Sequence, residues 1–268
     1  MTRGHSALVA VWSLLACSKA DVGTAKTETS RPAEGAADVG SAPPLAAAPP
    51  VPASPALAAP DPIRIEVVDV PGDLRALVLR GTPREHRFAM VYLHGMCVYP
   101  GYYVESFMNA AAARGDLVAV QGDVSCGGDH FLHTWSLDLA ALDRRIDAAF
   151  AAARIDAPHD IVLIGYSQGA DRAEALAARF PAKYRALVLI ASSSPPSPVR
   201  LAGVRAAVLM AGTRDAQSNM RAGLVALQRA RIPTTFIPMP AAWHGHMGSE
   251  PEVTMARALD FAERPLPP

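Results

Sequence analysis

The stretch from residue 161 to residue 180, IVLIGYSQGADRAEALAARF, limits the folds open to this chain more than any other part of it. It begins with four consecutive apolar residues, which is typical of a strand buried on both faces of a parallel sheet. A Gly-Tyr-Ser-Gln-Gly pentapeptide follows at once, and apolar residues then recur at helical spacing in Ala173, Leu176 and Ala177. A buried strand, a sharp turn and an amphipathic helix therefore meet at Ser167.

The two glycines of the pentapeptide explain how a strand can pass into a helix within so few residues. The residue at the apex of such a turn has a strained backbone and little space beside it, and Gly165 and Gly169 provide that space. The hydroxyl of Ser167 is then held above the sheet edge, near the free N–H groups of the helix start. This is the G-x-S-x-G turn that presents a nucleophilic serine, and a purely structural turn is the alternative.

The other elements alternate between apolar strands and amphipathic helices. This alternation predicts an α/β fold with a mostly parallel sheet, helices on both faces and an antiparallel hairpin at the start. The Pro-rich connection at residues 192–203 is too short for a cap domain, so an open cleft is expected. The expected elements are a hairpin of 63–69 and 74–80; strands at 88–93, 117–120, 186–191, 206–210 and 234–239; and helices at 101–114, 137–153, 216–231 and 251–263.

A serine nucleophile needs a base to accept its proton and a carboxylate to orient that base. Asp215 follows one buried strand and His244 follows the last one, and the ends of parallel strands share one edge of the sheet. We therefore predict that Ser167, Asp215 and His244 are the catalytic residues. His246 is the alternative base and Asp123 the alternative acid, and Asp215 is also in position merely to cap the following helix.

With these motifs the chain resembles the α/β-hydrolase superfamily from about residue 63 to the C-terminus. The pentapeptide is similar to that of carboxylesterases, enzymes of the dienelactone hydrolase type and cutinase-like enzymes. The resemblance implies an oxyanion hole formed by the backbone N–H groups of Met96 and Gln168, and a turn-shaping, non-catalytic role for His94. The motifs that carry the resemblance are Gly165-Tyr166-Ser167-Gln168-Gly169, His94-Gly95, Gly212 to Asp215 and His244-Gly245.

The resemblance implies hydrolysis of carboxylic esters through an acyl-enzyme intermediate, without a cofactor. The substrate is expected to be a small-molecule or polymer ester, and an open cleft favours water as the acceptor. Two alternatives stay open: a serine peptidase or amidase with the same three residues, and a non-catalytic surface lipoprotein that keeps the fold. The aromatic residues that could line the cleft or simply pack are Tyr99, Tyr102, Tyr103, Phe131 and Trp135.

Two cysteines of the folded part lie in loops that follow neighbouring predicted strands. Cys97 follows Met96, and Cys126 lies after the next strand, so we hypothesise a disulfide that holds the oxyanion turn; two free buried thiols are the alternative. Asp129, His130 and His133 suggest a metal cluster, but their spacing in an irregular loop lacks paired ligands, so no metal is predicted. No cofactor is predicted.

The beginning of the chain has the features of an export signal. Residues 1–17 contain Arg3 and an apolar run too short to cross a bilayer, and they end in Leu-Leu-Ala-Cys. That ending resembles a bacterial lipobox, which predicts lipidation of Cys17 and a membrane anchor; a plain signal peptide is the alternative. Residues 18–60 are rich in Ala and Pro and are predicted to be a disordered spacer, followed by a catalytic domain at 61–268.

Charge and location complete the predictions. Lys plus Arg and Asp plus Glu both number 25, which gives a formal net charge of zero. The sequence has no basic stripe, so nucleic-acid binding is not predicted. We expect an exported monomer, anchored to a membrane and facing the periplasm or the cell surface.

Overall fold

The computed structural model describes residues 62–82, 88–128, 131–156 and 160–264. The predicted signal peptide, Cys17 and the predicted spacer lie outside these residues, so they stay predictions. Within the described ranges, no helix combines the length and the apolar content that a bilayer-spanning helix needs.

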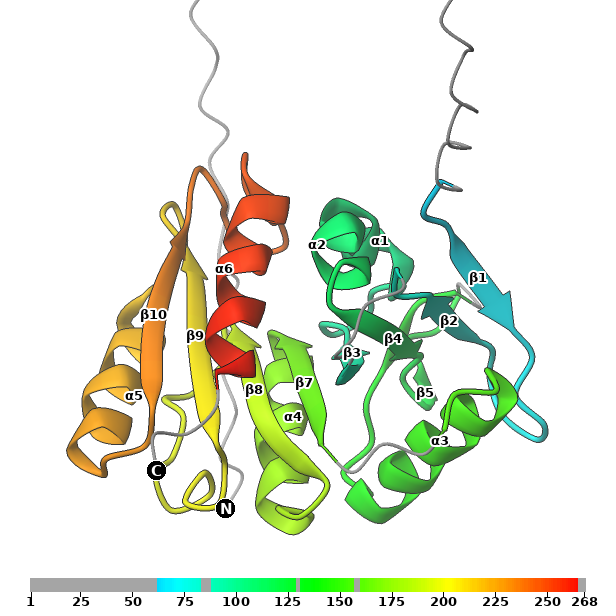
Figure 1. Ribbon diagram of the computed structural model, residues 1–268, viewed down its shortest axis with the longest axis horizontal. Coiled ribbons are helices and arrows are strands. Elements are labelled where there is room, and N and C mark those ends of the chain that lie inside the picture. The colour runs from blue at the N-terminus through cyan, green and yellow to red at the C-terminus, as the bar shows by residue number, and fades with distance from the viewer. Residues whose placement is uncertain (1–61, 83–87, 129–130, 157–159, 265–268) are drawn as a thin grey trace, which may run out of the picture. The chain divides into compact units, whose positions relative to one another are not determined.

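One large sheet forms the centre of the described part of the chain (Figure 1). Its first strand is antiparallel to the second, the second is antiparallel to β4, and the remaining neighbours are parallel. The predicted mostly parallel sheet with a hairpin at its start is therefore confirmed. In spatial order the strands are β1 (Ile65–Val68), β2 (Ala76–Leu79), β4 (Gly115–Val120), β3 (Phe88–Leu93), β7 (Ile161–Tyr166), β8 (Tyr184–Ile190), β9 (Ala206–Gly212) and β10 (Thr234–Met239).

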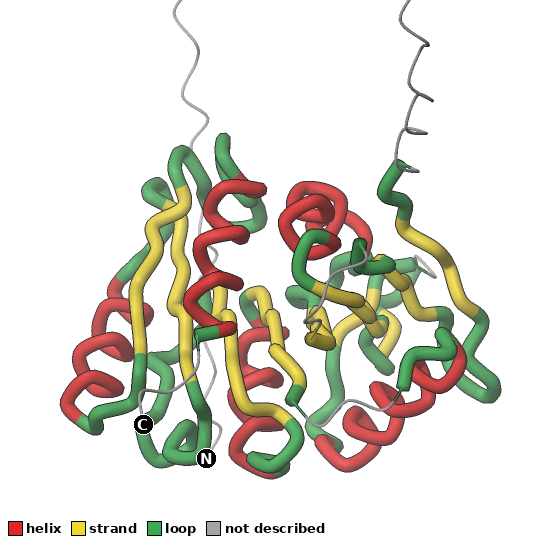
Figure 2. Tube along the Cα trace, in the orientation of Figure 1, coloured by secondary structure: helices red, strands yellow, loops and turns green. Residues whose placement is uncertain are grey.

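Helices pack on both faces of this sheet, as Figure 2 shows for the yellow strands and red helices. One face packs against α3 (Leu139–Ala152), α4 (Gln168–Arg179) and α5 (Ser218–Arg229). The other packs against α1 (Gly101–Val104), the 3₁₀ turn η1 (Glu105–Phe107), α2 (Met108–Ala112) and α6 (Pro251–Glu263). Successive residues of β7 alternate between the two cores: Leu163 belongs to the first and Ile164 to the second. This double burial explains the continuous apolar run of that strand.

The single helix predicted at 101–114 is wrong, because the structure breaks it into α1, η1 and α2. The hydroxyl of Ser106 donates to the carbonyl of Tyr103 at 2.6 Å, which competes with regular helical bonding. Phe107 then leaves the helical region with φ −135° and ψ 20°, and its side chain is buried. Burial of this aromatic ring therefore outweighs local helix propensity.

The segment around residue 133, predicted to be an irregular loop, contains a two-stranded ladder. β5 (Val124–Ser125) pairs antiparallel with β6 (His133–Thr134). Strands of two residues have no periodicity that a sequence could reveal. By contrast, residues 191–205, which join β8 to β9, form neither helix nor strand, in line with the short connection predicted there.

Candidate active site

Ser167 lies between the end of β7 and the start of α4, and its φ of 51° and ψ of −119° place it in a sparsely populated backbone region. A Cβ added at Gly165 would lie 2.5 Å from the Cα of Ala170. One added at Gly169 would lie 2.0 Å from the carbonyl oxygen of Leu93. Both glycines are therefore required by close backbone contact, which brings α4 against the end of β3.

The structure brings the three predicted catalytic residues into one hydrogen-bonded series. The Nε2 atom of His244 is 3.1 Å from the hydroxyl oxygen of Ser167, and its Nδ1 atom is 3.0 Å from Oδ2 of Asp215. An ionised carboxylate only accepts, so Nδ1 carries the proton and Nε2 accepts the serine hydroxyl. The side chain of His244 is 55% exposed and that of Asp215 is 12% exposed, so the base meets solvent while its partner is shielded.

Two loops that follow neighbouring strands position the base and the acid. The parallel pairing of β9 and β10 sets Gly212 beside Met239 at the end of the sheet. Beyond it, the N–H of Arg214 donates to the carbonyl of Ala242 at 2.8 Å, and the N–H of Ala241 donates to the hydroxyl of Thr213 at 2.9 Å. These hydrogen bonds fix the separation of the two loops.

Asp215 is not the N-cap residue of the following helix. Its Oδ1 atom accepts the N–H of Ala216 at 2.7 Å, but α5 starts later, at Ser218, with Gln217 as its N-cap residue. The other carboxylate oxygen holds the imidazole of His244. One carboxylate oxygen thus orients the loop, and the other orients the base.

The alternative base and the alternative acid have other partners. His246 stacks on Trp243 with ring centroids 4.3 Å apart, and its Nδ1 accepts the N–H of Gly248 at 2.8 Å. Asp123 accepts the N–H of Ser136 at 2.9 Å. The chain reverses at Gly245, whose φ is 88°, so the two histidines on either side of this turn diverge.

Tyr166, which sequence reasoning did not select, links the serine turn to the histidine loop. Its buried hydroxyl accepts the N–H of Gly245 at 2.6 Å, and its ring stacks on Tyr103 with centroids 4.7 Å apart. Burial raises the pKa of Tyr166, so the hydroxyl stays neutral. Strand alternation from Ile164 could have predicted which face Tyr166 occupies, but not which distant loop meets it there.

The two predicted oxyanion donors border Ser167. Gln168 is the first residue of α4, and the loop after β3 approaches so closely that a Cβ on Gly95 would lie 3.6 Å from the Cβ of Ser167. Among the described residues, no hydrogen-bond acceptor is found for the N–H of Met96 or of Gln168. The side-chain oxygen of Gln168 accepts the hydroxyl of Thr134 at 2.6 Å. The backbone N–H groups of Met96 and Gln168 are therefore free to donate hydrogen bonds to negative charge that develops beside Ser167.

His94 is buried and joins the loops that follow β3 and β4. Its Nδ1 lies 2.6 Å from the carbonyl oxygen of Gly95, and its Nε2 accepts the N–H of Gly122 at 2.8 Å. The indole of Trp135 donates to the carbonyl of His94 at 2.8 Å. Burial lowers the pKa of His94 to about 4, so this ring is neutral near neutral pH. Its bonds shape the turn that precedes Met96.

Solved structures resemble this arrangement of strands and helices. FphF of Staphylococcus aureus, a fluorophosphonate-binding serine hydrolase, is 12% identical; the match covers 75% of this chain and 98% of that chain, with a TM-score of 0.55. Carboxylesterase CesB of Bacillus subtilis is 13% identical, with 75% and 92% covered and a TM-score of 0.52. A predicted CIB-like hydrolase from Thermoplasma acidophilum is 15% identical, with 75% and 97% covered and a TM-score of 0.51.

This chain has the α/β-hydrolase fold. The resemblance inferred from the motifs is thus confirmed for the fold. No protein-family model matches the sequence, and no curated protein matches it either. The roles of individual residues therefore rest on the geometry described above.

A disulfide reinforces the α/β-hydrolase fold beside its serine turn. Cys97 and Cys126 are bonded, with their Cα atoms 5.7 Å apart, as hypothesised from their neighbouring loops. A β-bridge between Val98 and His133 lies next to it. The loop that carries Met96 is thereby attached to the β5–β6 ladder both covalently and through the backbone.

The structure describes one of the three sequence candidates for a metal cluster and all of the aromatic candidates for the cleft lining. His133 is buried and hydrogen-bonded to the amide of Gln121, while Asp129 and His130 lie outside the described residues. The residues that the structure does describe contain no group of three potential metal ligands. Of the aromatic candidates, Trp135 and Tyr103 are buried in packing, whereas Tyr102 and Phe131 are exposed.

Proposed function

We propose that this protein is a serine hydrolase that cleaves carboxylic esters. The observation that carries the proposal is the continuous series from the hydroxyl of Ser167 through His244 to Asp215, with distances of 3.1 and 3.0 Å. The strained turn at Ser167 supports it, because such strain persists where function requires it.

In this mechanism, the Oγ atom of Ser167 attacks the ester carbonyl carbon while its proton passes to Nε2 of His244. The carbonyl oxygen becomes an alkoxide. As this oxygen re-forms the C=O double bond, the bond between the carbonyl carbon and the alcohol oxygen breaks, and His244 protonates the departing alcohol oxygen. The acyl group stays on Ser167 as an ester. A water molecule then repeats the sequence, with His244 as base, and releases the carboxylic acid.

Backbone donors and solvent access complete the proposal. The N–H groups of Met96 and Gln168 stabilise the alkoxide, and each such donor contributes about 3 kcal/mol to lowering the barrier. His244 is 55% exposed, so water can reach the acyl-enzyme. This access favours hydrolysis over transfer to another acceptor. The substrate class is a small-molecule or polymer ester.

The test combines covalent labelling with turnover. A fluorophosphonate is expected to label the wild-type protein at Ser167, and p-nitrophenyl acetate is expected to be hydrolysed. Ser167→Ala should lose both, whereas Ser194→Ala, which changes an exposed serine in the loop after β8, should lose neither. Absence of label and turnover in the wild type would favour a non-catalytic protein. Faster cleavage of aminoacyl amides than of matched esters would favour a peptidase.

We also propose that the protein is exported and anchored through a lipid on Cys17. The Leu-Leu-Ala-Cys ending of the predicted signal supports this. Cys17→Ala should release the protein from the membrane fraction, and an unchanged distribution would overturn the anchor without affecting the proposed chemistry.

A further inference from the structure

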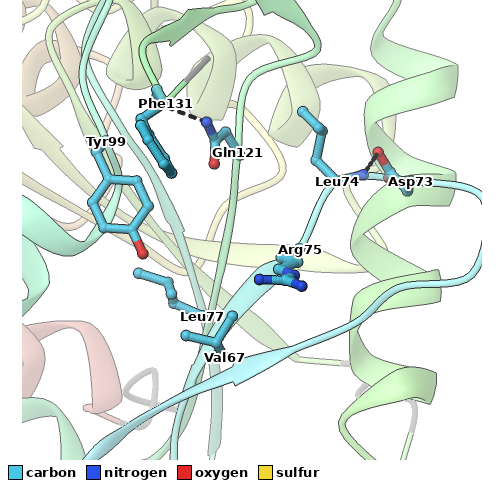
Figure 3. Close-up of a pocket in the computed structure, with 8 residues that line it drawn as sticks. All are labelled: Val67, Asp73, Leu74, Arg75, Leu77, Tyr99, Gln121 and Phe131. Carbon is cyan, nitrogen blue, oxygen red and sulfur yellow. Dashed lines mark hydrogen bonds between the residues drawn. The ribbon is translucent and has the colours of Figure 1, made fainter. Parts of the chain in front are cut away.

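A groove of about 710 Å³ opens at the β1–β2 side of the sheet, a size that suits a small-molecule site (Figure 3). Figure 3 shows Tyr99 and Phe131 along one side, with Leu77 and Val67 below them and Leu74 across the opening. Apolar and aromatic side chains thus dominate the wall. The lining residues are Val67, Asp73, Leu74, Arg75, Leu77, Tyr99, Gln121 and Phe131.

The charged residues of the groove are already paired with protein groups. The carboxylate of Asp73 is 2.7 Å from Nε of Arg145 and also accepts the N–H of Leu74 at 2.7 Å. The guanidinium of Arg75 lies 2.8 Å from the carboxylate of Asp69. Since these charges are matched, the groove does not require a charged ligand, and its apolar wall favours an uncharged aliphatic or aromatic group.

The groove lies on the same edge of the sheet as the candidate active site. Gln121 follows the end of β4, and β4 is separated from β7 by one strand, β3. Neighbouring strands are about 4.8 Å apart, so the end of β4 lies roughly 10 Å from the turn at Ser167. Tyr99 belongs to the loop that also carries Met96, so one wall of the groove adjoins the proposed oxyanion donor.

Hydrogen bonds hold this wall in place without a ligand. The amide nitrogen of Gln121, a residue only 8% exposed, donates to the carbonyl of Phe131 at 2.8 Å and also contacts His133. The disulfide between Cys97 and Cys126 joins the loop after β3, which carries Tyr99, to the loop between β5 and β6, which carries Phe131. A wall fixed in this way needs little ordering when a ligand binds.

The position of His244 decides which part of an ester reaches the groove. The departing alcohol oxygen must receive its proton from His244, which follows β10. In the sheet, β10 and β4 lie on opposite sides of β7. The alcohol therefore extends toward β10, and the acyl chain is the part that extends toward β4.

We propose that this groove binds the acyl chain of the substrate and that the chain is an uncharged aliphatic chain of medium length. The proposal rests on the proposed esterase function. An acetyl group does not span roughly 10 Å between strands, whereas octanoyl and decanoyl groups extend into the groove. Each methylene that enters an apolar site should raise kcat/KM about fourfold.

The first test compares p-nitrophenyl acetate, octanoate and decanoate. Val67→Trp places an indole into the groove and should lower kcat/KM for decanoate about tenfold while leaving acetate within about twofold. Val253→Trp on α6 is the matched control, because Val67 is 58% exposed and Val253 is 55% exposed. The Val253→Trp variant should leave kcat/KM unchanged for both the decanoate and the acetate ester. Leu74→Asp should also reduce the decanoate-to-acetate ratio, since it places a carboxylate in the apolar wall.

The second test reads binding without turnover. Calorimetric titration should detect binding of p-nitrophenyl decanoate to the Ser167→Ala protein. Binding to the double variant that carries both Ser167→Ala and Val67→Trp should be much weaker. If both groove variants keep the wild-type chain-length profile while acetate is hydrolysed, the groove proposal is overturned and the esterase proposal stands. If no ester is cleaved, the esterase proposal fails and the titration decides the groove. If p-nitrophenyl decanoate does not bind, the groove proposal is overturned. This is also the expected result if another part of the chain fills the groove.

Discussion

The strain at Ser167 can be measured by comparing two substitutions that both remove its hydroxyl. With φ 51° and ψ −119°, this residue is in a region that side chains with a Cβ rarely adopt. Ser167→Ala keeps the Cβ and the strain, whereas Ser167→Gly removes both. The difference in stability between the two variants therefore isolates the cost of the turn from its proposed chemistry.

The expected magnitude follows from two opposing contributions. Holding a residue in such a region costs about 1–3 kcal/mol. Glycine gains about 0.5–1 kcal/mol more conformational freedom than alanine in the unfolded chain. The Ser167→Gly protein should therefore be more stable than Ser167→Ala by about 1 kcal/mol, the reverse of the usual order.

The assay is urea denaturation with the disulfide intact, combined with turnover of p-nitrophenyl acetate. Ala222, an exposed residue in the interior of α5, supplies the control, because Ala222→Gly should lose about 1 kcal/mol of unfolding free energy in an ordinary helical position. If Ser167→Gly is no more stable than Ser167→Ala, the turn is not strained as argued. Ester turnover that persists in both variants would refute the nucleophile.

Three further predictions concern histidines and a tyrosine. His244→Ala should abolish ester turnover while His246→Ala retains it, and the reverse result would move the base to His246. Tyr166→Phe leaves the N–H of Gly245 without its acceptor and should lower kcat about tenfold with little change in KM; an effect on KM alone would contradict positioning of the base. Burial lowers the pKa of His94 to about 4. The unfolded chain therefore binds more protons below about pH 6.5, and the unfolding free energy should fall by about 2 kcal/mol from about pH 7 to about pH 5. Urea denaturation should show this loss in wild type and a smaller one in His94→Gln.

Much of the fold was predictable because its signals are local. The apolar run of β7, the two glycines around Ser167 and the helix after it each follow from a few adjacent residues. The strand at residues 88–93 and the helix at 251–263 were predicted with the observed bounds. The helix at 101–114 failed because burial of Phe107 is a tertiary effect.

The candidate site was only partly predictable. The order of Ser167, Asp215 and His244 along the chain could be read from strands and turns, but the choice between His244 and His246 depends on the reversal at Gly245.

By itself, the sequence determined the alternation of strands and helices and the placement of a serine at a strained turn, because propensity, periodicity and glycine content act over a few residues. Only the tertiary structure decided that Tyr166 meets the histidine loop, that the histidine faces the serine at 3.1 Å, and that an apolar groove opens at the β1–β2 side of the sheet. Such distances depend on how remote loops pack across strands, and packing is set by the shapes of all the side chains together.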